Sequence, residues 1–191
     1  MLQSVSKFLG GIGYISSKSS DNTITLRISG IEKCLIVRDY SINYPLMTYK
    51  LVYFQLWSTI LDQIIAKEHL TLTGLIKIVA LKAHFKGGLS LLLSANFPNY
   101  TPVLLPDYNL NLGLMYIFYI CSFINTDGSF FLLVSSDSRA TLGLRARLKI
   151  VLTQHTISLI VLQAIIAYPG LEVLKPKSEK PAYRLRISSL K

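Results

Sequence analysis

The sequence predicts an α+β fold, in which an antiparallel β-sheet has helices packed on one face and part of the structure is duplicated along the chain. Three observations lead to this prediction. Two segments near the ends of the chain repeat one another, the predicted strands alternate apolar and basic residues, and a helical region separates the two segments. A chain of 191 residues, 51% of them hydrophobic, can bury the core of one compact domain or of two small ones.

The repeat relates residues 11–32 to residues 170–191 at a constant offset of 159 residues. Seven of the 22 aligned positions are identical, and Leu26-Arg-Ile-Ser29 matches Leu185-Arg-Ile-Ser188 without a gap. Because solenoid repeats have periods of about 20–50 residues, a single repetition at this long spacing indicates a duplicated domain. Each copy is typical of a β-hairpin, and in the first copy residues 12–17 and 23–29 flank a polar turn.

The region between the repeats predicts helices and a linker. Residues 47–66 have apolar side chains at helical spacing, and residues 74–84 predict a second helix that Thr71 or Thr73 would cap. Three prolines in residues 95–106 indicate a linker to the second repeat. The three histidines and two cysteines lack metal-ligand spacing, so we expect neither a zinc site nor a disulfide framework.

Strand alternation places basic residues on one face of the predicted sheet. In residues 142–153, the apolar set Ala146, Leu148, Ile150 and Leu152 alternates with Arg145, Arg147 and Lys149. A β-ribbon fits the major groove of B-DNA, and arginine binds both phosphates and guanine edges. A solvated sheet face is the alternative. The candidate DNA-binding residues are Lys18, Arg27, Arg145, Arg147, Lys149, Lys177, Arg184 and Arg186.

The formal charge of +10 also favours an anionic partner, either phosphate backbones or a membrane surface, although it could serve solubility alone. The longest apolar run, residues 108–124, contains Asn109 and Asn111 and is shorter than the roughly 20 residues of a spanning helix. We therefore expect a buried interface helix, with Cys121 as a small packing residue, and a membrane partner is disfavoured. The N-terminus lacks the features of a signal peptide.

The most informative segment is residues 119–130, where an apolar helix runs into Asp127-Gly128 and an apolar strand follows. A carboxylate at the C-terminal end of a helix faces the negative end of the helix dipole, which costs roughly 0.3–1 kcal/mol. Stability alone does not favour Asp127 there, whereas Gly128 permits a sharp exit from the helix. By spacing alone, an ordinary turn remains the alternative.

The residues around this pair resemble the LAGLIDADG homing endonuclease family. Residues 120–128 are similar to the nonapeptide that names the family, with identities at Ile124, Asp127 and Gly128. Residues 142–155 resemble its second strand with a terminal Thr-Gln-His, and residues 44–50, 67–83 and 87–90 resemble its inter-domain helices. These motifs occur in the family's order over nearly the whole chain.

The resemblance implies a saddle-shaped α+β fold with a partial pseudo-twofold repeat. It assigns residues 1–84 to the C-terminal part of a first repeat, residues 85–109 to a linker and residues 110–191 to the N-terminal part of a second repeat. We therefore expect this chain to be a fragment of a two-repeat family member, a decayed copy of one, or the product of a mis-started reading frame. The resemblance also implies an organelle intron origin and a mitochondrial location.

By resemblance, the expected activity is metal-dependent hydrolysis of double-stranded DNA. Asp127 matches the acid that holds divalent metal, normally Mg²⁺, Gly128 adjoins it, and Gln154 matches a supporting position. The helix interface would use Cys121, Ser122 and Thr126, where relatives prefer small residues. Only one of the two motif acids is present, so a homodimer through residues 118–126 would supply the second. A non-cleaving binder of intron RNA or ribosomal RNA is the alternative function.

Overall fold

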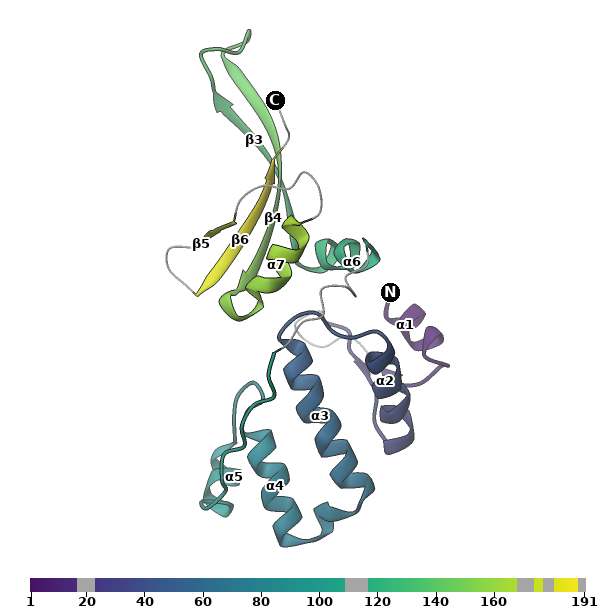
Figure 1. The fold of residues 1–191 in the computed structure, drawn as a ribbon. Helices are drawn as coiled ribbons and strands as arrows, with labels where there is room; N and C mark the ends of the chain where they lie inside the picture. Colours follow the sequence, from purple (N-terminus) through teal and green to yellow (C-terminus); the bar gives the residue numbers. More distant parts are fainter. Residues whose placement is uncertain (17–22, 109–116, 168–173, 177–180, 189–191) are drawn as a thin grey trace. The chain divides into compact units, whose positions relative to one another are not determined.

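A computed structural model describes most of the chain, namely residues 1–16, 23–108, 117–167, 174–176 and 181–188 (Figure 1). The chain divides into two compact units. The first comprises Met1–Leu46 and Lys50–Tyr108, and the second comprises Met47–Tyr49 and Asn109–Lys191. Among the helices that the structure describes, none is long and apolar enough to cross a membrane.

The first unit is mostly helical. Its elements in chain order are α1 (Leu2–Phe8), β1 (Tyr14–Ile15), β2 (Leu26–Arg27), α2 (Ile31–Asn43), α3 (Lys50–Ile65), a 3-10 turn (Glu68–Leu70), α4 (Leu72–Lys82) and α5 (Leu91–Asn96). Apolar residues of α3 and α4 form its core, with Val52, Leu56, Val79 and Leu81 all buried. The predicted helices are therefore present, although the predicted helix over 47–66 begins only at Lys50.

Two side-chain caps fix helix starts in this unit. The Thr71 hydroxyl accepts a hydrogen bond from the Gly74 N–H at 3.0 Å, which confirms Thr71 as the cap of α4. The Ser90 hydroxyl accepts one from the Leu93 N–H at 3.3 Å and begins α5. Helix α5 lies inside the stretch predicted to be a linker, because a good N-cap followed by three leucines can form a short helix beside prolines.

The second unit contains an antiparallel sheet and two helices. Its elements in chain order are α6 (Ile117–Asp127), β3 (Gly128–Ser136), β4 (Leu144–His155), a 3-10 turn (Thr156–Ser158), α7 (Leu159–Ile166), β5 (Leu174–Pro176) and β6 (Ala182–Ser188). The strand order is β3-β4-β6-β5, and every neighbouring pair is antiparallel. The predicted α+β class with helices against an antiparallel sheet is confirmed.

The core of this unit lies between the sheet and its helices. Leu152 of β4 and Leu185 of β6 are fully buried, and they meet apolar residues of α6 and α7 in one cluster that also includes Ile120, Phe123, Val161, Leu162 and Ile165. The segment Met47–Tyr49 joins this unit, since the Tyr49 N–H donates a hydrogen bond to the buried Ser158 hydroxyl at 3.2 Å. This docking explains why the predicted helix does not begin at Met47.

The two repeated segments form hairpins of equal register. In the first unit Ile15 pairs with Leu26, and in the second Leu174 pairs with Leu185, each residue lying 159 positions after its counterpart. A helix precedes each hairpin, α1 in the first unit and α7 in the second. Lys18 and Lys177, which the sequence placed in these hairpins, lie outside the described residues.

The outer part of the β3–β4 hairpin departs from the predicted burial. Strand β6 pairs with β4 only from Lys149 to His155, whereas β3 follows β4 out to Leu144 (Figure 1). The alternation placed Ala146 and Leu148 opposite the basic residues, on the face expected to pack against helices, and this is wrong for both because their side chains are exposed, Leu148 by 64%. Strands β3 and β4 continue beyond the end of β6 and beyond the helices. Of the apolar set of β4, only Ile150 and Leu152 are therefore covered.

Candidate functional site

The helix-to-strand junction brings Asp127 next to Gln154. Asp127 is the last residue of α6, and the pairing of Gly128 with Leu152 places the end of that helix beside the last residues of β4. The Gln154 side-chain N–H donates a hydrogen bond to Asp127 Oδ2 at 2.6 Å. Asp127 is exposed and Gln154 is half-buried. The carboxylate is thus oriented by an amide and still open to a ligand.

Gly128 is required at this junction by a close approach of backbone. A Cβ placed on Gly128 would lie 2.2 Å from the carbonyl oxygen of Ile124 and 3.1 Å from its side chain. Its φ is not among the positive values of the chain, so the left-handed exit that usually favours glycine after a helix does not apply. The absence of a side chain lets β3 begin directly against the last turn of α6.

Helix α6 buries one face and leaves the other uncovered. Ile120 and Phe123 contact the core, whereas the predicted interface residues Cys121, Ser122 and Thr126 are exposed. The Thr126 hydroxyl donates to the Ser122 and Phe123 carbonyl oxygens at 3.1 and 3.2 Å. The Thr126 hydroxyl is therefore satisfied within the helix, and the exposed strip consists of small side chains.

The strand register gathers the predicted basic residues of the second unit on one face of the sheet. Arg186 is opposite Val151, Arg184 is opposite Thr153, and Lys149 is opposite Phe131. Directly paired residues share a face and residues two apart along a strand do as well. The face therefore carries Arg145, Arg147, Lys149, Arg184 and Arg186.

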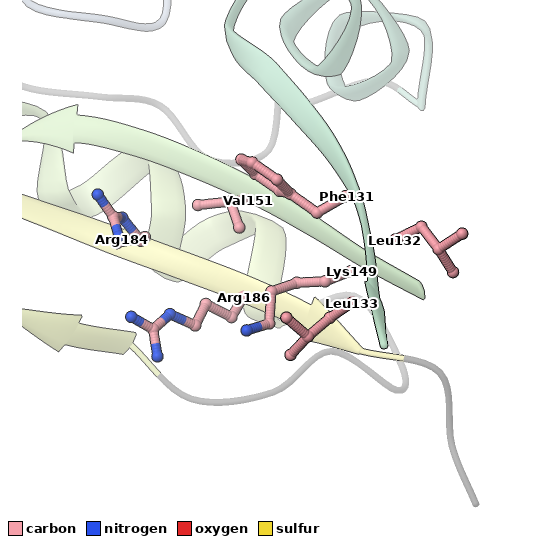
Figure 2. Close-up of a pocket in the computed structure, with 7 residues that line it drawn as sticks. All are labelled: Phe131, Leu132, Leu133, Lys149, Val151, Arg184 and Arg186. Carbon is pink, nitrogen blue, oxygen red and sulfur yellow. The ribbon is translucent and has the colours of Figure 1, made fainter. Parts of the chain in front are cut away.

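A shallow hollow of about 250 Å³ lies on this face (Figure 2). Figure 2 shows Arg184 and Arg186 on β6 beside Lys149 of β4, with Phe131 and Val151 near them. The Arg184 Nε is buried and has no hydrogen-bond partner among the described residues.

Arg27 does not join this face in any described contact. It lies on β2 of the first unit, where it is exposed and pairs with Tyr14. The structure therefore groups five of the eight predicted DNA-binding residues, and it describes Arg27 only within its own unit.

Sequence reasoning missed an ion-pair cluster at the turn between β3 and β4. Asp137 is 8% exposed, its carboxylate accepts the Arg139 N–H at 3.0 Å, and it lies 3.2 Å from Arg145 Nε and 3.8 Å from an Arg147 terminal nitrogen. The Arg139 Nε is 3.4 Å away. An Asp at the end of a strand, followed by Ser-Arg and a glycine turn, is the local signal that could have identified it.

The sequence profile of the LAGLIDADG endonuclease family matches residues 1–61 and 120–191. The chain belongs to the LAGLIDADG endonuclease family. The second matched segment begins within α6 and includes the Asp127–Gln154 pair and the basic face, and the first includes the hairpin of the first unit and most of α3.

Two curated relatives of the chain come from Neurospora crassa. "Probable intron-encoded endonuclease 3" is 29% identical over 187 residues, which are 98% of this chain and 35% of the relative. "Probable intron-encoded endonuclease 2" is 30% identical over 105 residues, which are 54% of this chain and 23% of the relative. The chain thus spans about a third of the length of the first relative.

Solved LAGLIDADG structures share the fold. I-SmaMI bound to cleaved DNA matches with a TM-score of 0.90 and 32% identity over 98% of this chain and 62% of its own. I-AabMI bound to uncleaved DNA matches with a TM-score of 0.83 and 26% identity over 98% of this chain and 64% of its own. The LAGLIDADG fold predicted from the motifs is confirmed.

Proposed function

We propose that this chain binds double-stranded DNA through the basic face of its second unit and takes part in metal-dependent hydrolysis of a phosphodiester bond at Asp127. The observation that carries the proposal is the junction itself. An exposed carboxylate, oriented by Gln154, lies at the end of a strand pair whose face carries a row of cations. Family membership and the DNA-bound relatives I-SmaMI and I-AabMI support it.

The basic face has the chemistry of a duplex-binding surface. Arg184, Arg186 and Lys149 surround a hollow partly lined by Phe131, so cations and apolar surface occur together. Each cation that neutralises a phosphate releases counterions, which makes binding depend on salt with a slope of about −0.9 per contact. Arg184 also lines this hollow, so its guanidinium can donate to a phosphate oxygen or a base edge.

The residues at the junction fit a magnesium ion shared with DNA. Among the described residues, no cluster of three or more His, Cys, Asp or Glu could hold a metal by itself. Mg²⁺ keeps several waters and is usually bound by one or two carboxylates plus substrate phosphates, so one exposed Asp is a sufficient protein share. The relative I-SmaMI with uncleaved DNA was obtained in the presence of calcium ions, which supports a divalent requirement.

In this mechanism Asp127 would hold the metal, with the Gly128 backbone beside it. When bound, the ion supplies charge neutralisation at the scissile phosphate and a more acidic water. Gln154 keeps Asp127 Oδ2 fixed through its hydrogen bond, so the carboxylate does not rotate as DNA arrives. The basic face holds the flanking phosphates and sets the register of the duplex on the sheet.

The exposed strip of α6 offers a contact for a second motif helix. Cys121, Ser122 and Thr126 are small or hydrogen-bonded within the helix, so another helix can approach closely. We propose that this surface brings a second acid to the site, and a homodimer is the arrangement that this chain provides by itself. Sedimentation at micromolar concentration, with Ser122→Glu as the variant that should separate the helices, tests this step.

The experiment for the whole proposal is cleavage of a selected duplex. Duplexes retained from a randomised pool in calcium are exchanged into magnesium, and strand breaks are followed over time. Wild type should cut, Asp127→Asn should lose at least ~100-fold in rate, and Gln154→Ala should lose roughly 10-fold, as second-layer ligands do. Asp39→Asn, which removes a carboxylate on α2, is the control that should cut normally.

Binding without cutting would favour the alternative function, a non-cleaving nucleic-acid-binding protein. Wild type and Asp127→Asn would then bind equally, with the same salt dependence, and magnesium would change nothing. A structured RNA probe in the same assay separates an intron-RNA or ribosomal-RNA binder from a DNA binder. No retention of either nucleic acid would refute both functions.

The origin and domain assignment are parts of the same proposal. The relatives are named intron-encoded endonucleases of a fungus, which supports an organelle-encoded, mitochondrial protein. The equal register of the two hairpins supports the assignment of residues 1–84 and 110–191 to parts of two family repeats.

A further inference from the structure

The turn between β3 and β4 holds a carboxylate in an unusual environment for a surface hairpin. Residues 137–143 close the hairpin through backbone hydrogen bonds, from the Asp137 N–H to the Gly143 carbonyl at 3.0 Å and from the Gly143 N–H to the Ala140 carbonyl at 2.8 Å. The Asp137 side chain is only 6% exposed, although the strands around it are open to solvent. Three arginines enclose it: Arg139, Arg145 and Arg147, which we term the arginine cluster.

The carboxylate is held in its charged form. The Arg139 N–H lowers the pKa of Asp137 most strongly, and the side chain of Arg139 with the charges of Arg145 and Arg147 lowers it further against the opposing effect of burial. One negative charge is thus fixed among three positive ones. An acidic group at this point weakens attraction for phosphate, so general DNA affinity does not account for it.

The contacts with Asp137 leave the terminal guanidinium nitrogens of Arg139 and Arg145 available to a ligand. Asp137 contacts Arg139 and Arg145 through Nε, on the inner side of each guanidinium, and the terminal nitrogens lie farther along each side chain. Arg145 and Arg147 share one face of β4, and their Cα atoms lie about 7 Å apart because alternate residues repeat at about twice 3.4 Å. The terminal edge of a guanidinium is the part that pairs with guanine O6 and N7.

An arginine side chain that moves freely can bind a phosphate, whereas recognition of a base edge requires an arginine side chain held in one orientation. Phosphates accept hydrogen bonds over many directions, whereas discrimination between base pairs depends on two simultaneous, well-aligned bonds. A buried, ionised carboxylate that restrains the side chains reduces the ordering needed on binding. This arrangement therefore favours selectivity over affinity.

We propose that Asp137 is a positioning residue for sequence recognition, which holds the arginine cluster so that the terminal nitrogens of Arg139 and Arg145 read guanine edges in the major groove of duplex DNA. This inference rests on the proposed function, namely that the basic face binds duplex DNA. An A-form RNA helix is a poor target for the cluster, because side chains cannot read its deep, narrow major groove.

The test uses the full chain and a pool of randomised 30-bp duplexes, sequenced after selection on wild type, Asp137→Asn and the matched control Asp39→Asn. Asparagine keeps an oxygen for the Arg139 N–H and removes the charge. Wild type should enrich guanines at neighbouring positions. Asp137→Asn should lose roughly 10-fold in discrimination there, bind unselected duplex more tightly and show a salt slope steeper by about one. Asp39→Asn should keep the wild-type preferences.

A second variant protects the test against misfolding of the turn. Arg139→Gln keeps the backbone N–H that Asp137 accepts, and it should weaken one guanine preference while the remaining positions stay as in wild type. If both variants enrich the same positions as wild type with undiminished discrimination, the inference is overturned while DNA binding stands. If wild type retains no duplex at all, the proposed function and the inference both fail.

Discussion

Replacing Gly128 by alanine tests the geometry of the α6–β3 junction most directly. The added Cβ would lie 2.2 Å from the Ile124 carbonyl oxygen and 3.0 Å from its carbonyl carbon. Atoms of this kind do not approach within 3.0 Å, so the backbone must separate by nearly 1 Å. The obstruction is backbone rather than a flexible side chain, and overpacking of this type costs about 3 kcal/mol.

Gly143→Ala is the matched control. Gly143 has a left-handed φ of +65°, and nothing lies within 4 Å of a Cβ built there. Alanine at this position suffers only the backbone strain, which is about 1 kcal/mol. Both substitutions lie in the second unit and add the same methyl group, so the difference between them isolates the contact with Ile124.

Urea unfolding with two probes measures the difference. Trp57, the only tryptophan of the sequence, lies on α3 in the first unit, so its fluorescence serves as an internal control. Hydrogen exchange of the β3 and β4 amides reports on the second unit. With a slope of about 2 kcal/mol per molar urea, a loss of about 3 kcal/mol lowers that unit's midpoint by about 1.5 M. A smaller loss for Gly128→Ala than for Gly143→Ala would refute the reasoning.

Four further predictions concern named side chains. Leu152→Ala should destabilise the second unit by about 2–5 kcal/mol, because Leu152 is fully buried, whereas the exposed Leu148→Ala should change it by less than about 0.5 kcal/mol, as hydrogen exchange would show. The pKa of Asp137 in the folded protein is below its unfolded value of 3.8, so its ion pairs stabilise the fold fully above pH 3.8 and are lost as the pH falls through the folded pKa. In acid, the melting temperature should therefore fall more steeply with decreasing pH for wild type than for Asp137→Asn. Thr71→Ala should cost the first unit about 1 kcal/mol in urea unfolding followed by tryptophan fluorescence, since it removes the cap of α4. Asp127→Asn should leave the melting temperature of the second unit unchanged or raise it by the equivalent of about 0.3–1 kcal/mol, because it removes a charge from the negative end of a helix.

The parts of the fold that sequence predicted are those fixed by local patterns. The α6 helix, its end at Asp127 and the strand that follows agree with the structure, because an apolar helical stripe, an Asp-Gly pair and an apolar strand are all local signals. The basic face was predictable for a similar reason, since alternation within β4 and β6 determines which residues share it. The repeat predicted two hairpins, and the equal register confirms that both copies pair in the same way.

Other features depend on tertiary contacts between segments that are distant in the sequence. The exposure of Ala146 and Leu148 follows from the shorter reach of β6, and no pattern within β4 reveals the length of its neighbour. Asp137 becomes informative only once the hairpin brings arginines from β4 to the turn. For the site, the local pattern singled out Asp127, whereas Gln154 came only through the family resemblance, because the hydrogen bond between them joins residues 27 positions apart.

The physical roles of α6 are divided between its two sides. Ile120 and Phe123 anchor the helix to the core, so they account for its stability. Asp127 lies at the unfavourable end of the helix dipole, and its hydrogen bond with Gln154 is exposed and contributes little to folding. Gly128 makes the close junction between this residue and β3. Asp127 is not needed for folding, and the adjacent Gly128 tolerates no side chain. The chemistry proposed for Asp127 best explains this pair of residues.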